Sequence, residues 1–452
     1  MGERLLAPPA PLAARLREVP RFTVFGRVTR VVGQVVESSS LDVSLGELCR
    51  IEHDGAPRVT AMVVGFHDRG LLLMPLRDLA GVAPGATVRP LGRALDVPVS
   101  DGLVGRVVDG LGKPMDGLGP VGRAARRPLN ADPPNPLARR RIDAPLGTGV
   151  RAIDGLVTIG RGQRVGIMAG SGVGKSVLLG MIARRTTADV NVIALLGERG
   201  REVREFIERD LGPEGLARSV VVVATSDQSA VVRATGALVA TAIAEHFRDQ
   251  GRDVLLMVDS VTRVAMAWRE TGLAVGEPPT TKGYPPSVFA QLPRLLERAG
   301  TGATGSITGL YTVLVEGDDF NEPIADAARG ILDGHIVLSR RLAAAKHFPA
   351  IDVLESVSRV RDAVVDAEHL QGANALLRLL AAYRDAEDLI TVGAYKPGAD
   401  RDVDAAIELR AASLQFLRQA PEVGTPYAAT RQQVLELARR GLAGGRATGA
   451  AA

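Results

Sequence analysis

Cysteine, histidine and long apolar runs are scarce in this sequence of 452 residues. The single cysteine, Cys49, excludes an internal disulfide and indicates a reducing compartment. The six histidines are scattered and form no H-E-x-x-H motif, so the sequence predicts no zinc site built from protein ligands. No stretch reaches the ~18 uncharged apolar residues of a membrane span, and the N-terminal residues lack the apolar core of a signal peptide. We therefore expect a cytosolic protein.

A strong charge of one sign is also lacking. The 55 basic residues nearly match the 51 acidic ones, and the net charge of +4 is small for this length, which argues against a surface that coats nucleic acid. Lysine supplies few of the basic residues, namely Lys113, Lys175, Lys282, Lys346 and Lys396. A lysine in a glycine-rich loop is therefore informative, because a compact ammonium fits between phosphate oxygens where a planar guanidinium does not.

The pattern of apolar residues divides the chain into five parts. Residues 1–20 contain a short amphipathic segment, APLAARLRE, which predicts a helix. Short Val-rich runs over residues 21–96 alternate in polarity and predict a small β-barrel. In residues 97–365, apolar runs without alternation are separated by helix-like segments, which predicts a parallel sheet covered on both faces. Residues 366–440 have a helical pattern, and residues 441–452 are predicted to form a disordered tail.

The stretch AGSGVGKS, residues 169–176, has the composition of a phosphate-binding loop. The run RVGIM before it predicts a strand, and KSVLLGMIARR after it predicts a helix. Backbone N–H groups of such a loop can turn toward phosphate oxygens at the positive end of the helix. Lys175 is expected to pair with the β- and γ-phosphates, and the Ser176 hydroxyl to ligate Mg²⁺. The expected nucleotide-binding residues are Ala169, Gly170, Ser171, Gly172, Val173, Gly174, Lys175 and Ser176.

The loop departs from the strict motif G-x-x-x-x-G-K-[ST] at its first position. Ala169 stands there instead of glycine. Alanine is tolerable at this position if its φ is negative, because only a positive φ demands a residue without a Cβ.

Two carboxylates that follow apolar runs are candidates for hydrolytic chemistry. Asp259 closes the run DVLLMVD, where a carboxylate at the carboxyl end of a strand can face a metal ion. Glu198 ends another run and could accept a hydrogen bond from a water aligned with the γ-phosphorus. Arg199, Arg201 and Glu202 lie in the same turn, so a solvated charge cluster is the alternative interpretation of this stretch.

Together these motifs resemble the ATPases related to the catalytic subunits of rotary ATP synthases. The matching stretches are AGSGVGKS, GERGREVREF, DVLLMVDSVTR and above all HFPAIDVLESVSR at residues 347–359. Within that group, YPPSVFAQLPRLLERAG, VEGDDFNEPIAD and ILDGHIVLSR are similar to the hexameric ATPases of bacterial flagellar protein export, with the injectisome ATPases of type III secretion next. The likeness runs from about Phe25 to Gly398.

The resemblance implies a fold, an activity and cofactors. The implied fold is of the α/β class, with an N-terminal β-barrel, a central RecA-like P-loop domain with a mainly parallel sheet, and a C-terminal helical domain. The implied activity is hydrolysis of ATP with Mg²⁺, which drives export of proteins by the flagellar type III secretion apparatus. The family acts as a homohexamer whose catalytic sites lie between subunits.

The resemblance also implies roles for single residues. Glu198 matches the catalytic glutamate, Arg199 lies beside it, and Glu202 matches a carboxylate that holds a magnesium-bound water. Asp259 matches the aspartate of the Walker B motif, and Arg263 matches an arginine near the γ-phosphate.

Two further residues are implied to act around the nucleotide. Arg359 matches the arginine finger that one subunit inserts into the site of its neighbour. Phe348 occupies the position of an aromatic residue that stacks on adenine. A finger from a neighbour makes hydrolysis depend on assembly, because the charge on the transferred phosphoryl group is neutralised only across the interface.

Partners are implied by position in the family. Residues 1–20 would bind a stator-like regulatory protein, and the C-terminal helices would engage a stalk protein, the export gate and complexes of chaperone and cargo. The implied location is cytoplasmic and peripheral, at the cytoplasmic face of the cell membrane. The loop around Lys282 lies where the family lines its central pore. No nucleic acid is expected among the partners.

Three alternative functions stay open. The same motor could serve a virulence-type injectisome. An RNA-dependent hexameric helicase would share the loop and the finger, but it would need stacking aromatics in the barrel, where only Phe22, Phe25 and Phe66 are present. A non-catalytic ring subunit would lack the carboxylate that orients water, whereas Glu198 is present here.

The Pro- and Arg-rich residues 125–149 predict a connector, with an RNA-binding arm as the alternative.

Overall fold

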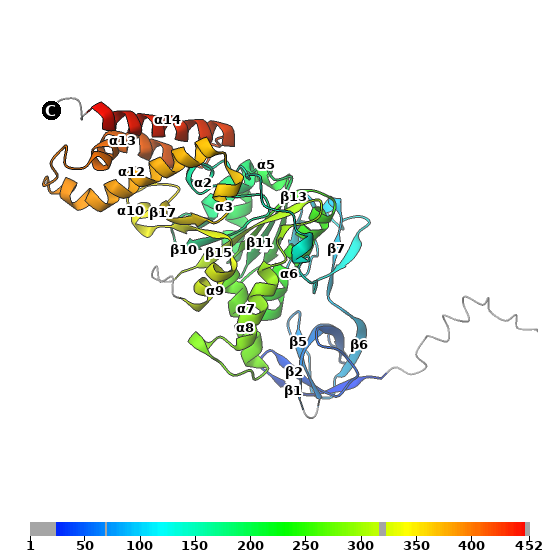
Figure 1. Ribbon diagram of the computed structural model, residues 1–452. Helices are drawn as coiled ribbons and strands as arrows, with labels where there is room; N and C mark the ends of the chain where they lie inside the picture. The colour runs from blue at the N-terminus through cyan, green and yellow to red at the C-terminus, as the bar shows by residue number, and fades with distance from the viewer. Residues whose placement is uncertain (1–23, 68–69, 316–321, 448–452) are drawn as a thin grey trace, which may run out of the picture. The chain divides into compact units, whose positions relative to one another are not determined.

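The computed structural model describes residues 24–67, 70–315 and 322–447 (Figure 1). The chain divides between Leu95 and Asp96 into two compact units. The helix predicted within residues 1–20 lies outside the described residues. In the part of the chain that is described, no helix combines the length and the apolar character that a membrane span requires.

The first unit contains a closed antiparallel barrel. Its strands are β1 (Gly26–Val32), β2 (Val35–Ser39), β3 (Glu47–Glu52), β4 (Val59–His67), β5 (Gly70–Pro75) and β6 (Thr87–Ala94), in the order β1-β2-β5-β4-β3-β6. Alternate residues of β4, beginning at Val59, are buried in the barrel. Cys49 lies in the same core, where burial and, to a smaller extent, the Glu47 carboxylate raise the pKa of its thiol to about 11. The predicted barrel is confirmed.

The second unit is built on a nine-stranded sheet. Its strands are β8 (Val107–Asp109), β10 (Arg164–Ala169), β11 (Val190–Leu196), β12 (Ser219–Ala224), β13 (Asp253–Asp259), β14 (Gly300–Thr301), β15 (Ser306–Leu314), β16 (Gly334–Leu338) and β17 (Ile351–Ser358). The order is β17-β16-β10-β15-β13-β11-β12-β8, with β14 paired to β15. Only β14 and β17 are antiparallel to their partners. Every residue of β11 and β12 is buried, as expected for a sheet covered on both faces.

Helices connect the strands of this sheet and cover it. They are α2 (Arg151–Leu156), α3 (Lys175–Arg185), α4 (Gly200–Glu205), the π-helical turn η3 (Phe206–Leu211), α5 (Gly212–Leu216), α6 (Ala230–Asp249), α7 (Val261–Ala274), α8 (Pro286–Leu296), α9 (Pro323–Ile331), α10 (Arg340–Ala344) and α11 (Arg361–Val364). Short 3₁₀ turns lie at η1 (Asp101–Leu103), η2 (Pro136–Ala138) and η4 (Thr281–Gly283). Strands β7 (Asp96–Val99) and β9 (Ala125–Pro128) form a separate antiparallel pair. The mainly parallel sheet predicted from the sequence is confirmed.

Three long helices, α12 (Ala367–Thr391), α13 (Arg401–Leu417) and α14 (Tyr427–Ala447), form the C-terminal part of the unit (Figure 1). The carboxylate of Asp366 caps α12 by accepting a hydrogen bond from the His369 N–H at 2.9 Å. Leu376, Phe416 and Val434 from these helices lie in the same apolar core as residues of the sheet. The predicted helical segment is confirmed, whereas its division from the sheet at residue 366 stays a prediction.

The C-terminal tail begins later than predicted. Helix α14 continues to Ala447, so the prediction of disorder is wrong for residues 441–447. The glycines at 444 and 445 lower helix propensity by only about 1 kcal/mol each, and an established helix adds one hydrogen bond for each further residue. Residues 448–452 lie outside the described part of the chain.

Candidate functional site

The phosphate-loop motif joins the end of β10 to the start of α3, as the sequence predicts. Gly172 and Gly174 have φ values of +78° and +90°, which glycine adopts at no steric cost. Ala169 is the last residue of β10 and pairs in register with Leu314 and Leu338 of the two neighbouring strands. It is therefore extended, is not among the residues with positive φ, and needs no glycine. The departure from the strict motif has no structural cost.

Lys175 points its ammonium at two carboxylates. Its Nζ lies 2.5 Å from Asp259 Oδ1 and 3.6 Å from Glu198 Oε1. The three side chains are only 13%, 4% and 13% exposed, respectively. Lys175 begins α3, Asp259 ends β13, and Glu198 follows β11, so the carboxyl edge of the sheet brings together residues that are distant in sequence. Paired charges of this kind are stable at low exposure because each satisfies the other.

Asp259 has a second partner that the sequence did not reveal. The hydroxyl of Thr312 in β15 donates a hydrogen bond to Asp259 Oδ1 at 2.7 Å, and both side chains are buried. Strand β15 lies between β10 and β13 in the sheet. The place of β15 between these two strands has no local signal in the sequence.

Glu198 is placed by the residue before it. Gly197 has φ +71°, and a Cβ there would lie 2.8 Å from Arg263 Cδ, so the turn requires glycine for both its backbone and its packing. Arg263 Nε lies 3.4 Å from Glu198 Oε1. Burial raises the pKa of the Glu198 carboxyl, and Lys175 and Arg263 oppose the rise. A carboxylate with a raised pKa beside a phosphate loop is suited to accept a hydrogen bond from water.

Glu202 and Arg199 lie at the outer side of Glu198. A hydrogen bond between the carboxyl groups of Glu202 and Glu198 lowers the pKa of Glu202 and adds to the rise in the pKa of Glu198. Arg199 Nη1 lies 3.3 Å from Glu202 Oε1, but its side chain is 78% exposed, so water screens its charge. The predicted turn is thus a charge cluster, but the side chain of its inner member Glu198 is only 13% exposed.

A cavity of about 700 Å³ brings the predicted residues together. Its lining includes the phosphate loop, Glu198, Arg199, Glu202, Asp259 and Arg263. Sequence reasoning missed Arg340 at the start of α10 and Arg209 of the π-helical turn η3, which line it as well. The π-helical turn η3 has no local signature in the sequence, and such turns often accompany functional sites.

Phe348 and Arg359 do not line this cavity. Phe348 is 41% exposed. Its ring lies beside the phosphate loop, at 3.7 Å from the position that a Cβ on Gly174 would take. Arg359 directly follows β17, whose Ser358 pairs with Gly334 at the start of β16. It therefore lies at the edge where the parallel strands begin, one strand length or ~17–20 Å from the edge that carries the phosphate loop.

The donor set fits a magnesium ion that is shared with a nucleotide. No group of three or more metal-ligating His, Cys, Asp or Glu side chains occurs in residues 24–67, 70–315 and 322–447. Mg²⁺ typically takes one or two protein oxygens and completes its shell with water and substrate phosphates. The Ser176 hydroxyl and the Asp259 carboxylate, which line the same cavity, offer such oxygens.

Comparison with known proteins gives matches along most of the chain. Models for the beta-barrel domain and the nucleotide-binding domain of the ATP synthase alpha/beta family match residues 28–92 and 149–358. A model described as the T3SS EscN ATPase C-terminal domain matches residues 365–436.

Two curated relatives are similar over nearly the full length. The flagellum-specific ATP synthase of Bacillus subtilis (strain 168) is 56% identical over 403 residues, which cover 88% of this chain and 91% of the relative. The type 3 secretion system ATPase of Xanthomonas euvesicatoria is 54% identical over 404 residues, which cover 89% and 91%.

The fold is also found in a solved structure. The assembled ATPase EscN from the type III secretion system of enteropathogenic E. coli is 45% identical, with a TM-score of 0.87, and the match covers 91% of this chain and 100% of that one. Its complex with the central stalk EscO gives a TM-score of 0.85 with the same coverage.

The contact between Thr312 and Asp259 makes a prediction about stability. Thr312→Val keeps the shape of the side chain but leaves a buried carboxylate oxygen without its hydroxyl donor. We expect the free energy of unfolding to fall by about 1–3 kcal/mol. Thr312→Ser, which keeps the hydroxyl, is the matched control and should lose less. Denaturant unfolding followed by circular dichroism measures both, and a Thr312→Val variant as stable as the parent would contradict the prediction.

Proposed function

This chain belongs to the ATP synthase alpha/beta family, and from that membership we propose that it hydrolyses ATP to drive protein export by a flagellar type III secretion apparatus. We further propose that it acts as a homohexamer, with each catalytic site formed by two neighbouring copies. The observation that carries the proposal is the convergence of Lys175, Asp259 and Glu198 beside a glycine-rich loop at the start of a helix.

The phosphate loop binds the triphosphate in this proposal. Backbone N–H groups of residues 170–176 and the positive end of α3 attract phosphate oxygens. The Lys175 ammonium, which Asp259 and Glu198 hold in the structure, is positioned to exchange these carboxylates for the β- and γ-phosphates. Phe348, exposed beside Gly174, offers a face for the adenine ring.

Hydrolysis requires a water molecule in line with the γ-phosphorus. Glu198 orients that water by accepting a hydrogen bond, and Arg263 at 3.4 Å holds the carboxylate in place. Ser176 and Asp259 would hold Mg²⁺, with Glu202 acting through a bound water, and the ion would neutralise charge on the phosphates. Arg199 contacts Glu202 and is too exposed to contribute more than weak electrostatic support.

Arg359 acts in trans in this proposal. It lies at the edge of the sheet opposite the phosphate loop of its own chain, so a second copy is needed to bring a guanidinium to each site. Such an arginine stabilises charge on the transferred phosphoryl group and is worth roughly 10³–10⁵ in rate. One sequence carries both Glu198 and Arg359, so identical copies suffice for a closed ring.

The partners follow from the same family membership. EscN has been solved in complex with its central stalk EscO, and we infer that a stalk protein contacts the present ring at its C-terminal helices. We also propose that residues 1–20 bind a stator-like regulator, and that the export gate and chaperone–cargo complexes bind the ring. The ring would then be peripheral to the cytoplasmic face of the cell membrane.

An injectisome function is the second candidate, because the Xanthomonas relative is 54% identical, close to the 56% of the Bacillus relative. Deletion of the gene in its own host separates the two. Loss of flagella with normal secretion of effectors supports the flagellar assignment. Normal flagella would overturn that assignment and favour the injectisome.

Glu198→Gln tests the role of the Glu198 carboxylate. The amide keeps the shape of the side chain but loses the charge that polarises water, so kcat should fall by about 10²–10⁴-fold while binding of ATP is kept. Steady-state phosphate release and equilibrium binding of a fluorescent ATP analogue measure the two quantities. Glu208→Gln, whose exposed carboxylate lies outside the lining of the cavity, is the control and should leave kcat near the parent value. Unchanged turnover in Glu198→Gln would remove Glu198 from the mechanism.

The raised pKa of Glu198 predicts the acid limb of the pH profile. The carboxylate must be ionised to orient water, so kcat/KM should fall as the pH drops through the pKa of Glu198, which burial places above the usual value for glutamate. The residual activity of Glu198→Gln should lack this limb. Measurement of kcat/KM from pH 4 to 9 in both proteins tests this, and an identical acid limb in the variant would assign it to another group.

Mixed rings test whether the site is shared. Arg359→Ala and Lys175→Ala should each abolish turnover when alone, since each removes one half of every site. Random mixing restores complete sites at about a quarter of the interfaces, because only a Lys175-intact copy beside an Arg359-intact copy is competent. Phosphate release after co-assembly measures the recovery. A mixture no more active than its two components would rule out the shared site.

A further inference from the structure

The backbone of Arg359 is fixed by a cluster of polar contacts where β10 and β16 begin. The Arg359 N–H donates to the carbonyl of Asp333 at 3.0 Å. The Nε2 of Gln163 donates to the same carbonyl at 2.9 Å and to the Ser358 hydroxyl at 3.1 Å. The chain just before Arg359 is therefore tied to the residue that precedes β16.

Asp333 is in turn held by Arg164, the first residue of β10. The Arg164 N–H, Nε and Nη2 donate to the Asp333 carboxylate at 3.1, 3.0 and 3.1 Å, and the Asp333 N–H donates to the Arg164 carbonyl at 2.8 Å. The two side chains are 15% and 27% exposed. A bidentate guanidinium–carboxylate pair fixes direction as well as distance, so it fixes the carbonyl of Asp333 to which Arg359 is bound.

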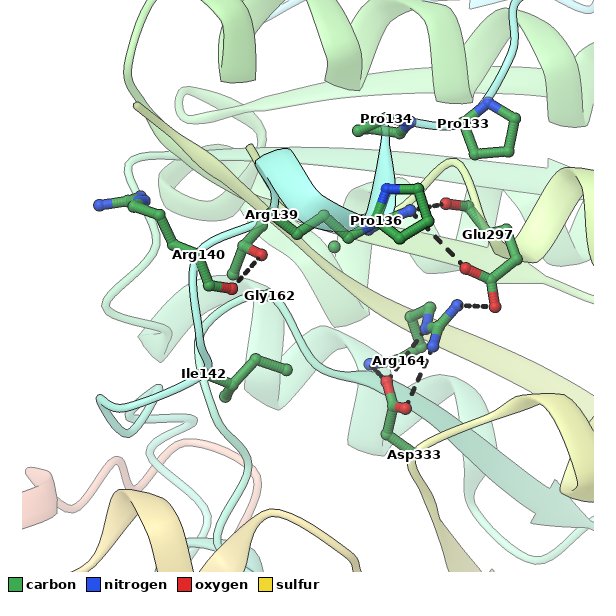
Figure 2. A pocket seen from close by; sticks show the side chains of 12 residues that line it. Pro133, Pro134, Pro136, Arg139, Arg140, Ile142, Gly162, Arg164, Glu297 and Asp333 are labelled. Atoms are coloured by element: carbon green, nitrogen blue, oxygen red, sulfur yellow. Dashed lines mark hydrogen bonds and ion pairs between the residues drawn. The ribbon is translucent and has the colours of Figure 1, made fainter. Parts of the chain in front are cut away.

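Residues that are distant in sequence contact the other side of the Arg164 guanidinium (Figure 2). Its guanidinium forms an ion pair with Glu297, and Arg139 of the proline-rich connector lies 3.7 Å from the same carboxylate. Arg139 also donates to the carbonyl of Ala299 at 2.8 Å. A cavity of about 500 Å³ borders Arg164, Glu297 and Asp333. Charge contacts, and not close packing on every side, therefore set the position of Arg164.

The side chain of Arg359 has little else to direct it. It is exposed, and its Nη2 donates to the carbonyl of Arg329 at 3.3 Å. A long side chain that reaches into another subunit depends on where its backbone is held. A displacement of ~1 Å in a catalytic group can cost ~10²-fold in rate.

We propose that Asp333, held by Arg164, is a positioning residue that aims the Arg359 guanidinium at the catalytic site of the neighbouring copy. This inference rests on the proposed function, since it presumes that Arg359 acts in trans. Asp333 itself touches no reacting atom. Its effect belongs to the site of the neighbour, and the nucleotide site of its own chain is left intact.

Asp333→Ala tests this inference. We expect kcat to fall by about 10–100-fold, because Arg359 is kept but is no longer aimed, while KM for ATP and binding of an ATP analogue change by less than about twofold. Asp333→Asn keeps the shape of the side chain and one acceptor for Arg164, and should lose less activity. Thermal unfolding of each variant shows that the fold is retained.

A matched control lies at the same edge of the sheet. Asp253 begins β13 and pairs with Arg161 at 2.8 Å, but no hydrogen bond connects it to Arg359. Asp253→Ala removes a comparable ion pair and should leave kcat within about twofold of the parent value. An equal loss of kcat in both variants would mean that the sheet edge matters only for stability, and would overturn the inference.

Mixed rings separate positioning from a general structural defect. In a mixture of Asp333→Ala with Lys175→Ala, sites that combine the phosphate loop of the first with Arg359 of the second are complete, so activity should rise above that of either protein. If this mixture fails while Arg359→Ala with Lys175→Ala recovers, the positioning role is wrong and the shared site stands. If neither mixture recovers, the shared site fails and the inference fails with it.

Discussion

A lysine ammonium held by two carboxylates organises the nucleotide-binding unit around its phosphate loop. Lys175 lies 2.5 Å from Asp259 and 3.6 Å from Glu198, and none of the three side chains is more than 13% exposed. Charges at such low exposure are tolerated only when they are paired. The contact therefore requires the start of α3 and the ends of β11 and β13 to meet, and the same charges are the ones that a triphosphate and its cation can replace.

The order of strands explains how four separate segments reach this place. Strands β10, β15, β13 and β11 are successive neighbours and run parallel, so their carboxyl ends share one edge. Each contributes one polar feature there: the phosphate loop, Thr312, Asp259 and, after Gly197, Glu198. The antiparallel strand β17 runs the other way and therefore delivers Arg359 to the opposite edge. One sheet thus carries, at its two ends, the residues that we propose to form the two halves of a shared site.

Much of this arrangement could be predicted from the sequence, because its signals are local. The glycine-rich loop and the carboxylates that end apolar runs predicted which residues meet, and the buried runs predicted the parallel sheet. Thr312 and Arg340 could not be found in this way, since each depends on which strands are neighbours. The likeness to a known family supplied a role for Arg359, but the contacts that hold it involve Arg164 and Asp333, which are far apart in sequence and became adjacent only through folding. Local propensity was least informative at the C-terminus, where α14 continues through two glycines.

Strand β10 has a phosphate loop at one end and the anchor of Arg359 at the other. It is six residues long; all six residues pair with β15, and residues 166–169 also pair with β16. In the proposed ring, every copy of β10 would have a catalytic interface at each end. Its own chain would bind the triphosphate at one of these interfaces, and the adjoining chain would bind it at the other. The same short strand would therefore lie between the triphosphate held by its own chain and the triphosphate held by the adjoining chain.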